Sequence, residues 1–380
     1  MKQQTCAITE TRNKDKHIID FSGKTLYVGI DVHQKDWQVA TVHQEVCLGN
    51  HRMGADYDRL IHHLRSRYPG AVFKCVYESS AWGFNLQRRL SAAGIECIVV
   101  NAADVATNDK ERRRKTDKVD ALKLARNHAS GDLKAIYVPS ETDQKERNLI
   151  RYRKRIVGDL NRSKNRIKSF LKYQGIDIPE KFGKACWSKV FLEWVQQEGQ
   201  KDPLIGDVLL LMVEQVKHLR QLKLSVEKKL RLMMKSEKYK VQSELLHSVP
   251  GVGSVVSALF LLEVGDTSRF KNFDRLNDFV GFCPDTNSSG ETELDTGITR
   301  RRHKQLRTAL IEAAWEAKRS DPAMLDAYLE LTKRMPGNKA IVRIARKLLR
   351  RMRAVLLSGV PYQKGTISST NNNYKINKEK

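Results

Sequence analysis

Tyr27-Val28-Gly29-Ile30-Asp31 is an apolar, β-rich run that ends in a carboxylate, and the predicted folded part of the chain begins with it. Two runs of the same character follow at Asp36–Val42 and Val46–Met53, so the three together predict an antiparallel meander. Beyond them, predicted strands alternate with predicted helices: strands at 73–77 and 95–100, helices at 57–67, 82–92 and 118–127. This alternation predicts an α/β domain, a sheet covered by helices, over residues 24–139.

The next hundred residues are predicted to be helical. Ser140 and Asp143 have the spacing of a capping box, and apolar positions from Leu149 share one helix face as far as Gly175. A second long helix is predicted after Pro203. Its apolar positions recur on three- and four-residue steps, which is typical of a coiled-coil seam: Ile205, Leu209, Met212, Val216, Leu219, Val226, Leu230 and Met233. We expect an α-helical coiled-coil region over 140–240. The same pattern suits an ordinary bundle within one chain, and a dimer seam stays open.

The remaining segments are predicted from composition. Residues 241–359 contain short helical patterns with Gly-rich joints, so we expect a mostly α C-terminal domain. Residues 1–23 are polar and are expected to be a flexible arm. Residues 360–380 are rich in Asn and Lys and are expected to be a disordered tail.

The charge balance points to a polyanionic partner. Lys plus Arg number 69 against 44 Asp plus Glu, which gives a net charge of +25. Cations that meet phosphates release condensed counterions, so such an excess favours nucleic acid over a merely solvated surface, which usually mixes the two signs. A basic protein without a nucleic-acid partner is the alternative.

The cysteines and the hydropathy exclude several classes of protein. Six cysteines are scattered along the chain without a C-x-x-C pair, which argues against a zinc site and against a disulfide framework. No apolar run reaches about 18 residues, and the N-terminus lacks a secretory signal, so we expect no membrane span. These features fit a reducing cytosol.

Four carboxylates are candidates for a metal site. Asp31 and Glu78 each end a predicted strand, and Asp117 and Asp120 lie at i, i+3 near the start of a predicted helix. Acids gathered at the carboxyl edge of a sheet repel one another unless cations neutralise them. Two Mg²⁺ ions about 4 Å apart would do so and would activate an oxygen nucleophile on phosphorus. Any one of the acids alone also suits a surface charge or a cap, Asp120 in particular.

A glycine turn near the C-terminal domain's start is a candidate phosphate contact. Pro250-Gly251-Val252-Gly253 precedes an apolar helix, and glycine lets the backbone approach a phosphate at the helix N-terminus. We therefore predict a helix-hairpin-helix-like element in which Gly251 and Gly253 contact DNA. A plain turn between two helices is the alternative.

A hydroxyl beside a cationic run is the candidate nucleophile. Ser288-Ser289-Gly290 is followed by a basic segment, and a hydroxyl attacks a phosphodiester when cations stabilise the pentavalent charge. The cations that we expect to contact nucleic acid here are Arg300, Arg301, Arg302, Lys304 and Arg307. Ser-Ser-Gly by itself is a weak motif, typical of loops.

A later predicted helix carries basic residues opposite an apolar face. We expect Arg343, Arg346 and Arg350 on it to contact nucleic acid, with Lys339, Lys347, Arg351 and Arg353 on the same helix. A solvated charged face is the alternative.

These motifs resemble one known family. Gly29-Ile30-Asp31-Val32-His33, Tyr77-Glu78 and Thr116-Asp117-Lys118-Val119-Asp120 resemble the DEDD carboxylates of the insertion-sequence 110 family of transposases. The Pro-Gly-x-Gly turn, the Ser-Gly motif and Gly297-Ile298-Thr299-Arg300 resemble that family's C-terminal domain. The resemblance covers roughly residues 25–355. Arg301-Arg302-His303 is a departure, because many relatives have Arg-Gly-Asn or Arg-Gly-Asp in that place, and the local turn stays open.

The resemblance implies a fold and an activity. The front domain would be RuvC-like, of the RNase H type, with Asp31, Glu78, Asp117 and Asp120 as Mg²⁺ ligands. Ser289 would be the nucleophile of a covalent DNA intermediate, with Ser288 as the alternative. The family further implies donor and target DNA, a non-coding bridge RNA, and a homo-oligomer (dimer or tetramer) whose protomers share the active site, with the long helices carrying the protomer contacts.

Two other functions remain open at this stage. A RuvC-like structure-specific endonuclease would hydrolyse DNA with water and would need only the four acids. A non-catalytic nucleic-acid-binding protein would use the same acids structurally, and metal-dependent strand cleavage separates it from both enzymes.

Overall fold

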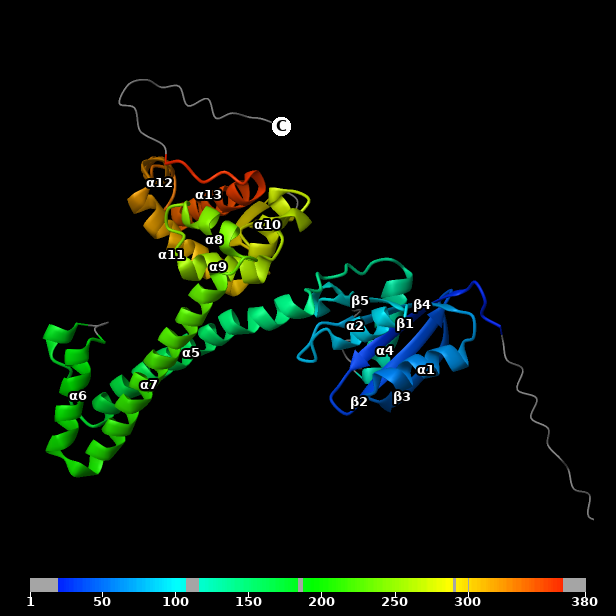
Figure 1. The fold of residues 1–380 in the computed structure, drawn as a ribbon, viewed down its shortest axis with the longest axis horizontal. Helices are drawn as coiled ribbons and strands as arrows, with labels where there is room; N and C mark the ends of the chain where they lie inside the picture. Colours follow the sequence, from blue (N-terminus) through cyan, green and yellow to red (C-terminus); the bar gives the residue numbers. More distant parts are fainter. Residues whose placement is uncertain (1–19, 107–115, 184–186, 290–291, 300, 365–380) are drawn as a thin grey trace, which may run out of the picture. The chain divides into compact units, whose positions relative to one another are not determined.

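The computed structural model describes residues 20–106, 116–183, 187–289, 292–299 and 301–364. The chain divides into two compact units, Met1–Val138 and Pro139–Lys380 (Figure 1). Most of the arm and of the tail predicted from the sequence, as well as Gly290 and Arg300, lies outside the described residues. Among the described helices, none combines the length and the apolarity needed to cross a membrane.

The first unit is built on a five-stranded mixed sheet. Its strands are β1 (Thr25–Val32), β2 (Asp36–His43), β3 (Val46–Gly54), β4 (Val72–Glu78) and β5 (Glu96–Val100). Their order is β3-β2-β1-β4-β5, and β1, β2 and β3 pair antiparallel, whereas β4 pairs parallel with both β1 and β5. The predicted meander and the α/β class are therefore confirmed.

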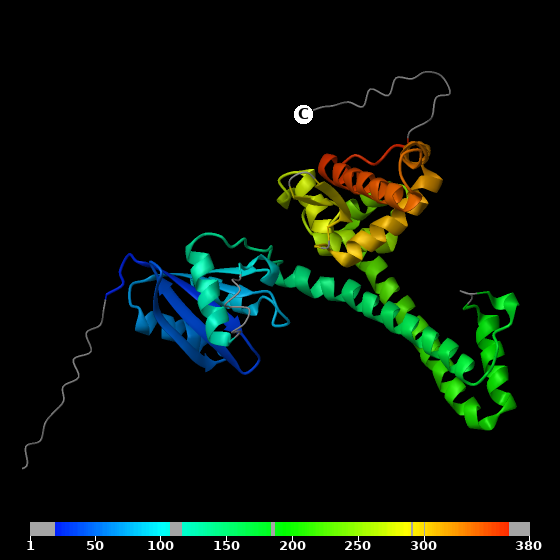
Figure 2. The same cartoon turned by 180° about the vertical axis from the view of Figure 1, so that it is seen from behind.

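Helices cover both faces of this sheet. Leu60 and Leu64 of α1 (Tyr57–Arg67) and Leu90 of α2 (Asn85–Ala92) share a core with Val28 and Ile30 of β1. The opposite face packs against α4 (Asp117–Ala129), seen in teal in front of the sheet in Figure 2. This two-sided cover explains why the central strands are apolar runs with few polar positions.

The predicted flexible arm and the predicted disordered tail are both shorter than expected, because each contains an ordered aromatic residue next to the folded part. Phe21 was placed in the flexible arm, but it is buried and its ring meets Tyr68 edge-on at 5.2 Å between centroids. Tyr362 was placed in the disordered tail, but its hydroxyl donates to Asp321 at 2.9 Å and its backbone N–H donates to Ser248 at 2.7 Å. Composition alone does not reveal such single aromatic anchors.

The second unit begins with a hairpin of long helices. It consists of α5 (Glu141–Tyr173), α6 (Lys189–Lys201) and α7 (Pro203–Met234). Ser163 of α5 donates to Gln215 of α7 at 3.0 Å, and Arg153 pairs with Glu227 at 2.6 Å, so α5 and α7 run antiparallel. Leu209, Val213 and Val216 of α7 pack on α5 and α6 of the same chain. Part of the predicted seam is thus filled within one chain.

Helix α6 was not predicted from the sequence. It packs against α7 where two glycines meet, because a Cβ on Gly206 would lie 2.2 Å from the Gly199 carbonyl oxygen. This close approach lets Phe191 and Val195 join the core between the long helices. The cue that was overlooked is the Phe191, Leu192, Val195 spacing after the N-cap Ser188.

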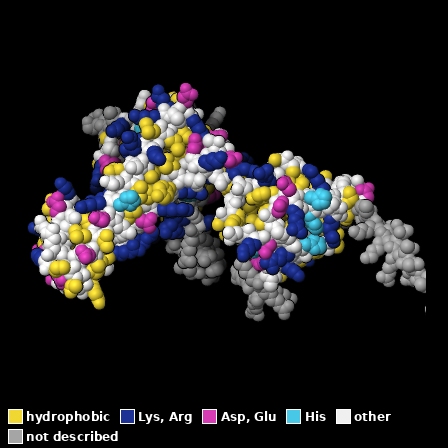
Figure 3. All heavy atoms as spheres, turned by 60° about the horizontal axis from the view of Figure 1, so that its bottom comes forward, with side chains coloured by type: hydrophobic (Ala, Val, Ile, Leu, Met, Phe, Trp, Pro, Cys, Tyr) yellow, Lys and Arg dark blue, Asp and Glu magenta, His cyan; other side chains and the backbone are white. Residues whose placement is uncertain are grey.

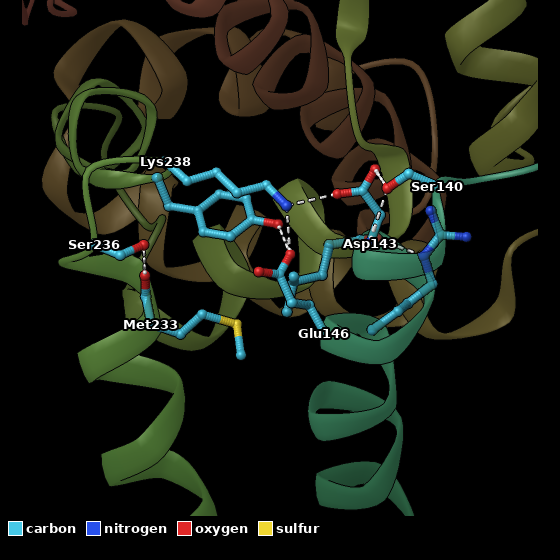
Figure 4. A network of polar contacts seen from close by, with 9 residues as sticks. Ser140, Asp143, Glu146, Met233, Ser236 and Lys238 are labelled. Atoms are coloured by element: carbon cyan, nitrogen blue, oxygen red, sulfur yellow. Dashed lines mark hydrogen bonds and ion pairs between the residues drawn. The ribbon is translucent and has the colours of Figure 1, made fainter.

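A network of polar contacts joins the start of α5 to the residues that follow α7 (Figure 4). Ser140 caps α5 by accepting from the Asp143 N–H at 3.1 Å, as the capping-box spacing predicted. Lys238, just beyond α7, donates to Asp143 at 2.7 Å and to Glu146 at 2.6 Å, and the Tyr239 hydroxyl also donates to Glu146. The start of α5 is therefore tied to the end of α7.

The C-terminal part of this unit surrounds one buried helix. Its elements are α8 (Lys240–His247), α9 (Ser254–Val264), α10 (Phe273–Val280), β6 (Pro284–Ser289), β7 (Thr292–Ile298), α11 (Lys304–Ser320), α12 (Pro322–Thr332) and α13 (Gly337–Ser358). Every residue from Ser257 to Val264 of α9 is buried. Ile150 and Ile156 of α5 and Val226 of α7 belong to the same core, so the helix bases and the C-terminal elements fold together.

The antiparallel β6–β7 hairpin corrects the prediction of helices and loops in this part of the chain. Residues 284–289 have no apolar residue after Pro284, and residues 292–298 have only Leu294 and Ile298 in an alternating pattern, so the periodicity signal is weak. Paired backbone groups stabilise such a ladder without an apolar stripe.

Candidate active site

Neighbouring strands bring Asp31 and Glu78 to one edge of the first unit's sheet. The last paired residues of the parallel β1–β4 register are Ile30 and Tyr77. Asp31 and Glu78 each follow directly, so the two acids lie side by side at the carboxyl ends of adjacent parallel strands. The predicted placement of these two acids at strand ends agrees with this register.

Helix α4 reaches this edge because β1 carries a glycine. A Cβ on Gly29 would lie 2.1 Å from the Ala121 carbonyl oxygen and 2.5 Å from the Ala125 nitrogen, so only glycine lets α4 pack directly on β1. The first turn of α4 is fixed by the N-cap Thr116 and by Asn50, whose side chain donates to the Lys118 carbonyl at 2.9 Å. This packing carries Asp117 and Asp120 to the sheet edge.

Three side chains converge here. Among the described residues, Asp31, His33 and Asp117 offer ligand atoms that all lie within 4.8 Å of one another. His33 Nε2 is 3.2 Å from Asp31 Oδ2 and 3.7 Å from Asp117 Oδ1. His33 was not among the metal ligands predicted from the sequence. Its position two residues after a strand-end acid is the cue that would have found it, because i and i+2 share a face in extended chain.

The other two predicted ligands lie outside this group of three. Asp120 pairs with Lys123 at 3.2 Å, and both side chains are largely buried. Glu78 is half-buried at the end of β4. The structure therefore brings two of the four predicted acids together with one unpredicted histidine, and it engages Asp120 with a cation of its own helix.

The electrostatics of Asp31 suit a cation site. Burial raises the pKa of the Asp31 carboxyl, and Asp117 and Asp120 raise it further, whereas His33 opposes them. A carboxylate in such surroundings is stabilised by a bound cation. The oxygen donors of Asp31 and Asp117 are the ligands that Mg²⁺ prefers, so these residues fit a magnesium ion.

In the second unit, Ser289 is the last residue of β6 and pairs with Thr292 at the closed end of the hairpin. Ser288 pairs with Glu293, one position further from that end. The open end of the hairpin is held by Arg307, whose Nη1 donates to the carbonyl oxygens of Gly281 at 2.7 Å and Thr299 at 2.8 Å. Arg307, which the sequence predicts to neutralise DNA phosphates, thus also donates to backbone carbonyls through Nη1.

The other predicted cations near Ser289 differ in their positions. Arg301, Arg302 and Lys304 are exposed at the start of α11. A Cβ on Gly281 would lie 2.4 Å from the Arg302 Cβ, and the positive φ of +90° at Gly281 also requires glycine. Arg301, Arg302 and Lys304 are thus presented to solvent directly after β7.

His303 settles the turn that the sequence left open. Its Nδ1 accepts from the Leu306 N–H at 3.2 Å and so caps α11, a role that Asn or Asp also performs. Its Nε2 lies 3.4 Å from Oε2 of Glu263, a buried residue of α9. Arg151 of α5 donates twice to the same carboxylate, at 2.8 Å each. One buried acid thus links α5, α9 and α11.

This linkage predicts a pH-dependent stability. Burial alone would raise the pKa of Glu263, but the hydrogen bonds from Arg151 and His303 outweigh it and lower the pKa to about 2. A depressed carboxyl pKa stabilises the fold above the unfolded value and loses that contribution as pH falls towards 2. We expect wild type to be more stable than Glu263→Gln by on the order of 3 kcal/mol at pH 7, and the gap to shrink below about pH 4.5.

Urea unfolding between pH 7 and 3 measures this gap. The matched control is Glu312→Gln, an exposed acid of α11, which we expect to unfold like wild type at every pH. A gap between wild type and Glu263→Gln that stays constant down to pH 3 would contradict the assignment.

The two predicted glycine contacts have different surroundings. Gly251 has a positive φ of +82°, and a Cβ there would lie 2.3 Å from the Ala313 carbonyl oxygen, so Gly251 is required for packing against α11. Gly253 is exposed, with no heavy atom within 4 Å of a built Cβ, and it precedes the first turn of α9. Of the two, Gly253 leaves more room for a phosphate.

The basic residues of α13 also separate into two groups. Arg351 pairs with buried Asp321 at 2.5 Å, and Arg353 donates to the Phe270 carbonyl at 3.4 Å, so both hold the fold. Arg343 is exposed. Arg346 and Arg350 lie over the Phe273 ring, with their guanidinium carbons 5.7 and 4.7 Å from its centroid, and Arg346 also lies 3.4 Å from Asp274.

Comparison with known proteins gives matches in both units. The model of a transposase family with DEDD residues matches residues 28–174, and the model described as "Transposase IS116/IS110/IS902 family" matches residues 243–329. The first match contains Asp31, Glu78, Asp117 and Asp120, and the second contains Ser289.

Curated relatives agree with these models. A putative transposase of Sinorhizobium fredii is 31% identical over 64% of this chain and 58% of its own length. The transposase for insertion sequence element IS1533 of Leptospira borgpetersenii is 23% identical over 77% of this chain and 85% of its own length. A second putative transposase of Sinorhizobium fredii is 27% identical, over 72% of this chain and 74% of its own length. The match therefore covers less than two thirds of the length of the first relative and more than two thirds of the length of each of the other two.

Proposed function

This chain belongs to the IS116/IS110/IS902 family of transposases, and we propose that it cuts and rejoins DNA with a carboxylate-held metal centre and a serine nucleophile. The observation that carries the proposal is the convergence of Asp31, His33 and Asp117 beside the end of β4. A sheet edge that collects acids from adjacent strands and from a packed helix supports a RuvC-like fold for this domain.

We assign Asp31, Glu78, Asp117 and Asp120 as the ligands of two Mg²⁺ ions. Bound Mg²⁺ polarises a phosphodiester and lowers the pKa of the attacking hydroxyl. The protein's own contribution is to hold the acids on rigid elements, with Gly29 setting how closely α4 approaches. Lys123 pairs with Oδ1 of Asp120 at 3.2 Å, so Oδ2 is the oxygen that we assign to the metal.

The joining step is assigned to Ser289. Its Oγ forms a bond to phosphorus while the phosphorus bond to the leaving strand's oxygen breaks, and the hydroxyl proton passes to a base. Arg301, Arg302 and Lys304 stabilise the pentavalent phosphate, with Arg300 as a further candidate. Because the new bond is again a phosphodiester, a second strand can displace Ser289 without an energy-rich cofactor.

The family resemblance extends the proposal to partners. Donor and target DNA are the substrates, and a non-coding bridge RNA selects them; the net charge of +25 supports both polyanions. A homo-oligomer would supply the acids from one protomer and the serine from another, with contacts through a coiled coil of the long helices. The same resemblance supports a cytoplasmic, nucleoid-associated enzyme.

The products in Mg²⁺ test the proposed activity. We expect a duplex that contains a recombination junction to yield joined strands in Mg²⁺ and none in excess chelator. An endonuclease that uses water would leave free ends only, and a non-catalytic binder would leave the duplex intact. Free ends without any joined strand, at every Mg²⁺ concentration, would reject the proposal in favour of the nuclease.

Helix α13 is proposed to follow the DNA backbone. We expect Arg343→Glu, Arg346→Glu and Arg350→Glu together to weaken binding to all duplex sequences equally and to reduce the salt slope by up to about 3, because each phosphate contact contributes about 0.9. Fluorescence anisotropy over a salt series measures both. A control with the same charge change, Arg319→Glu, Lys333→Glu and Arg334→Glu, alters exposed cations of α11 and the end of α12. Equal losses in the two triple variants would count against a specific α13 surface.

A further inference from the structure

The outer half of α5 is strongly cationic. From Arg151 to Tyr173 the sequence has nine Lys or Arg residues and a single acid, Asp159. Figure 3 shows dark-blue Lys and Arg side chains gathered along the long-helix hairpin beside a hydrophobic stripe. Surface helices usually mix the two signs, so a run of this kind indicates a polyanionic partner for this part of the hairpin.

A groove on α5 combines these cations with hydrogen-bonding and aromatic groups. It is lined by Arg162, Asn165, Arg166, Ser169, Phe170 and Tyr173 of α5 and by Met212 of α7. The groove is shallow and open to solvent, with a volume of about 490 Å³, which suits a strand lying along the helix better than an enclosed small ligand. The Tyr173 side chain is 85% exposed, which leaves its ring open for stacking.

A second cationic group surrounds Trp187. The Nζ atoms of Lys164 and Lys168 lie 5.6 and 5.7 Å from its ring centroid, and Arg220 of α7 donates to its carbonyl oxygen. Burial lowers the pKa of Lys164, and Arg220, Lys223 and Lys168 lower it further. Cations that repel one another in this way are stabilised by phosphates placed between them.

We propose that the groove on α5, between Arg162 and Tyr173, binds an unpaired nucleic-acid strand. Arg162 and Arg166 contact its phosphates, Asn165 and Ser169 hydrogen-bond to it, and Tyr173 stacks on a base. Lys164 and Lys168 lie on the other side of α5, beside Trp187, and are not part of this groove. This site is separate from the carboxylate centre and from α13, so the two proposals can fail independently.

Charge and ring exposure select this occupant over others. A second copy of this chain would bring the same cations to the face, so self-association through it is opposed by repulsion. A duplex would meet the cations equally well, but its bases are stacked and present no face to Tyr173. Stacking on aromatic side chains is typical of single-strand binding.

The test compares Tyr173→Ala with Tyr152→Ala in the full chain. Tyr152 is 47% exposed on the same helix but outside the groove, so it is a matched control. We measure anisotropy with a labelled single-stranded RNA, the same sequence as single-stranded DNA, and the duplex. Because stacking contributes about 1–3 kcal/mol per base, we expect Tyr173→Ala to weaken single-strand binding by roughly 5- to 150-fold. Duplex binding should not change, and Tyr152→Ala should match wild type throughout.

A charge variant and a crosslink complete the experiment. We expect Arg162→Gln with Arg166→Gln to lower the salt slope for single strands by about 1.4, at about 0.7 per phosphate. Ultraviolet crosslinking should join the strand to the peptide that contains Tyr173. If the variants weaken binding of single-stranded RNA more than binding of single-stranded DNA, the natural strand is RNA. The reverse result identifies it as DNA.

Three results would overturn the proposal. The first is single-strand affinity unchanged in both groove variants. The second is an equal loss for duplex and single strand in Tyr173→Ala. The third is a changed oligomeric state of Tyr173→Ala in sedimentation with single-strand affinity kept, which would assign the face to a protein contact.

Discussion

We expect Ser289→Ala to lose both the covalent protein–DNA adduct and strand joining, and Ser288→Ala to keep them. The two serines are adjacent in β6, and we assign the attack to Ser289 because it directly precedes Gly290 in the Ser-Gly motif. Ser289 is the one at the closed end of the β-hairpin, where it pairs with Thr292. Loss of a nucleophile that works as part of a catalytic group typically costs several orders of magnitude, so we expect at least about a 10³-fold fall in joining.

A suicide substrate detects this effect. Protein is incubated in Mg²⁺ with DNA nicked so that the leaving strand diffuses away, then denatured and separated by size. Wild type should give a band shifted by the DNA, and peptide mapping should place the adduct on Ser289. An adduct on Ser288, or normal joining by Ser289→Ala, would contradict the assignment. Metal-dependent cleavage without any adduct in wild type would favour hydrolysis by water.

Asp31→Asn is expected to abolish DNA cleavage in Mg²⁺ without unfolding the protein. The amide keeps the shape of the side chain and removes the charge that a cation needs. We expect a rate at least about 10³-fold below wild type, since a barrier increase of about 4 kcal/mol corresponds to that factor. Because burial already disfavours the Asp31 carboxylate, the variant should unfold at the same temperature as wild type or a higher one in metal-free buffer.

The matched control for this variant is Asp58→Asn, an exposed acid in the first turn of α1 in the same unit. It removes one charge and should cleave like wild type. Thermal unfolding in chelator separates lost activity from lost fold. Wild-type cleavage by Asp31→Asn at a standard Mg²⁺ concentration would exclude Asp31 as a ligand, and a large fall in its unfolding temperature would make it a structural acid.

Sequence patterns predicted the first unit well, for a physical reason. Buried parallel strands must be apolar on both faces, so Val28, Ile30 and Val76 stand out without any knowledge of partners. Asp31 and Glu78 are conspicuous because each is an acid at or next to the end of such an apolar run. The α/β class and the strand-end positions of Asp31 and Glu78 follow from these local properties alone.

The roles of individual cations were not predictable in this way. In the sequence, Arg307 and Arg351 stand in basic segments, as the exposed Arg343 does. Their partners in the fold are the Gly281 carbonyl and buried Asp321, which lie 26 and 30 positions away. Only the fold brings such distant groups together. His33 is a further example, because its role depends on where α4 places Asp117. The β6–β7 hairpin is another, because backbone hydrogen bonds stabilise it.

The buried Glu263 carboxylate restricts where the second unit can be cut and recombined by a protein engineer. A chimaera joined at residue 240 looks natural, because the long helices end there, but it would separate Glu263 from Arg151 and remove Ile150 and Ile156 from the core. An unpaired buried charge is strongly destabilising, so such a graft would need the donor's own α5 base as well. The transferable module is therefore discontinuous in sequence, and Arg151 and Glu263 should be exchanged only as a pair.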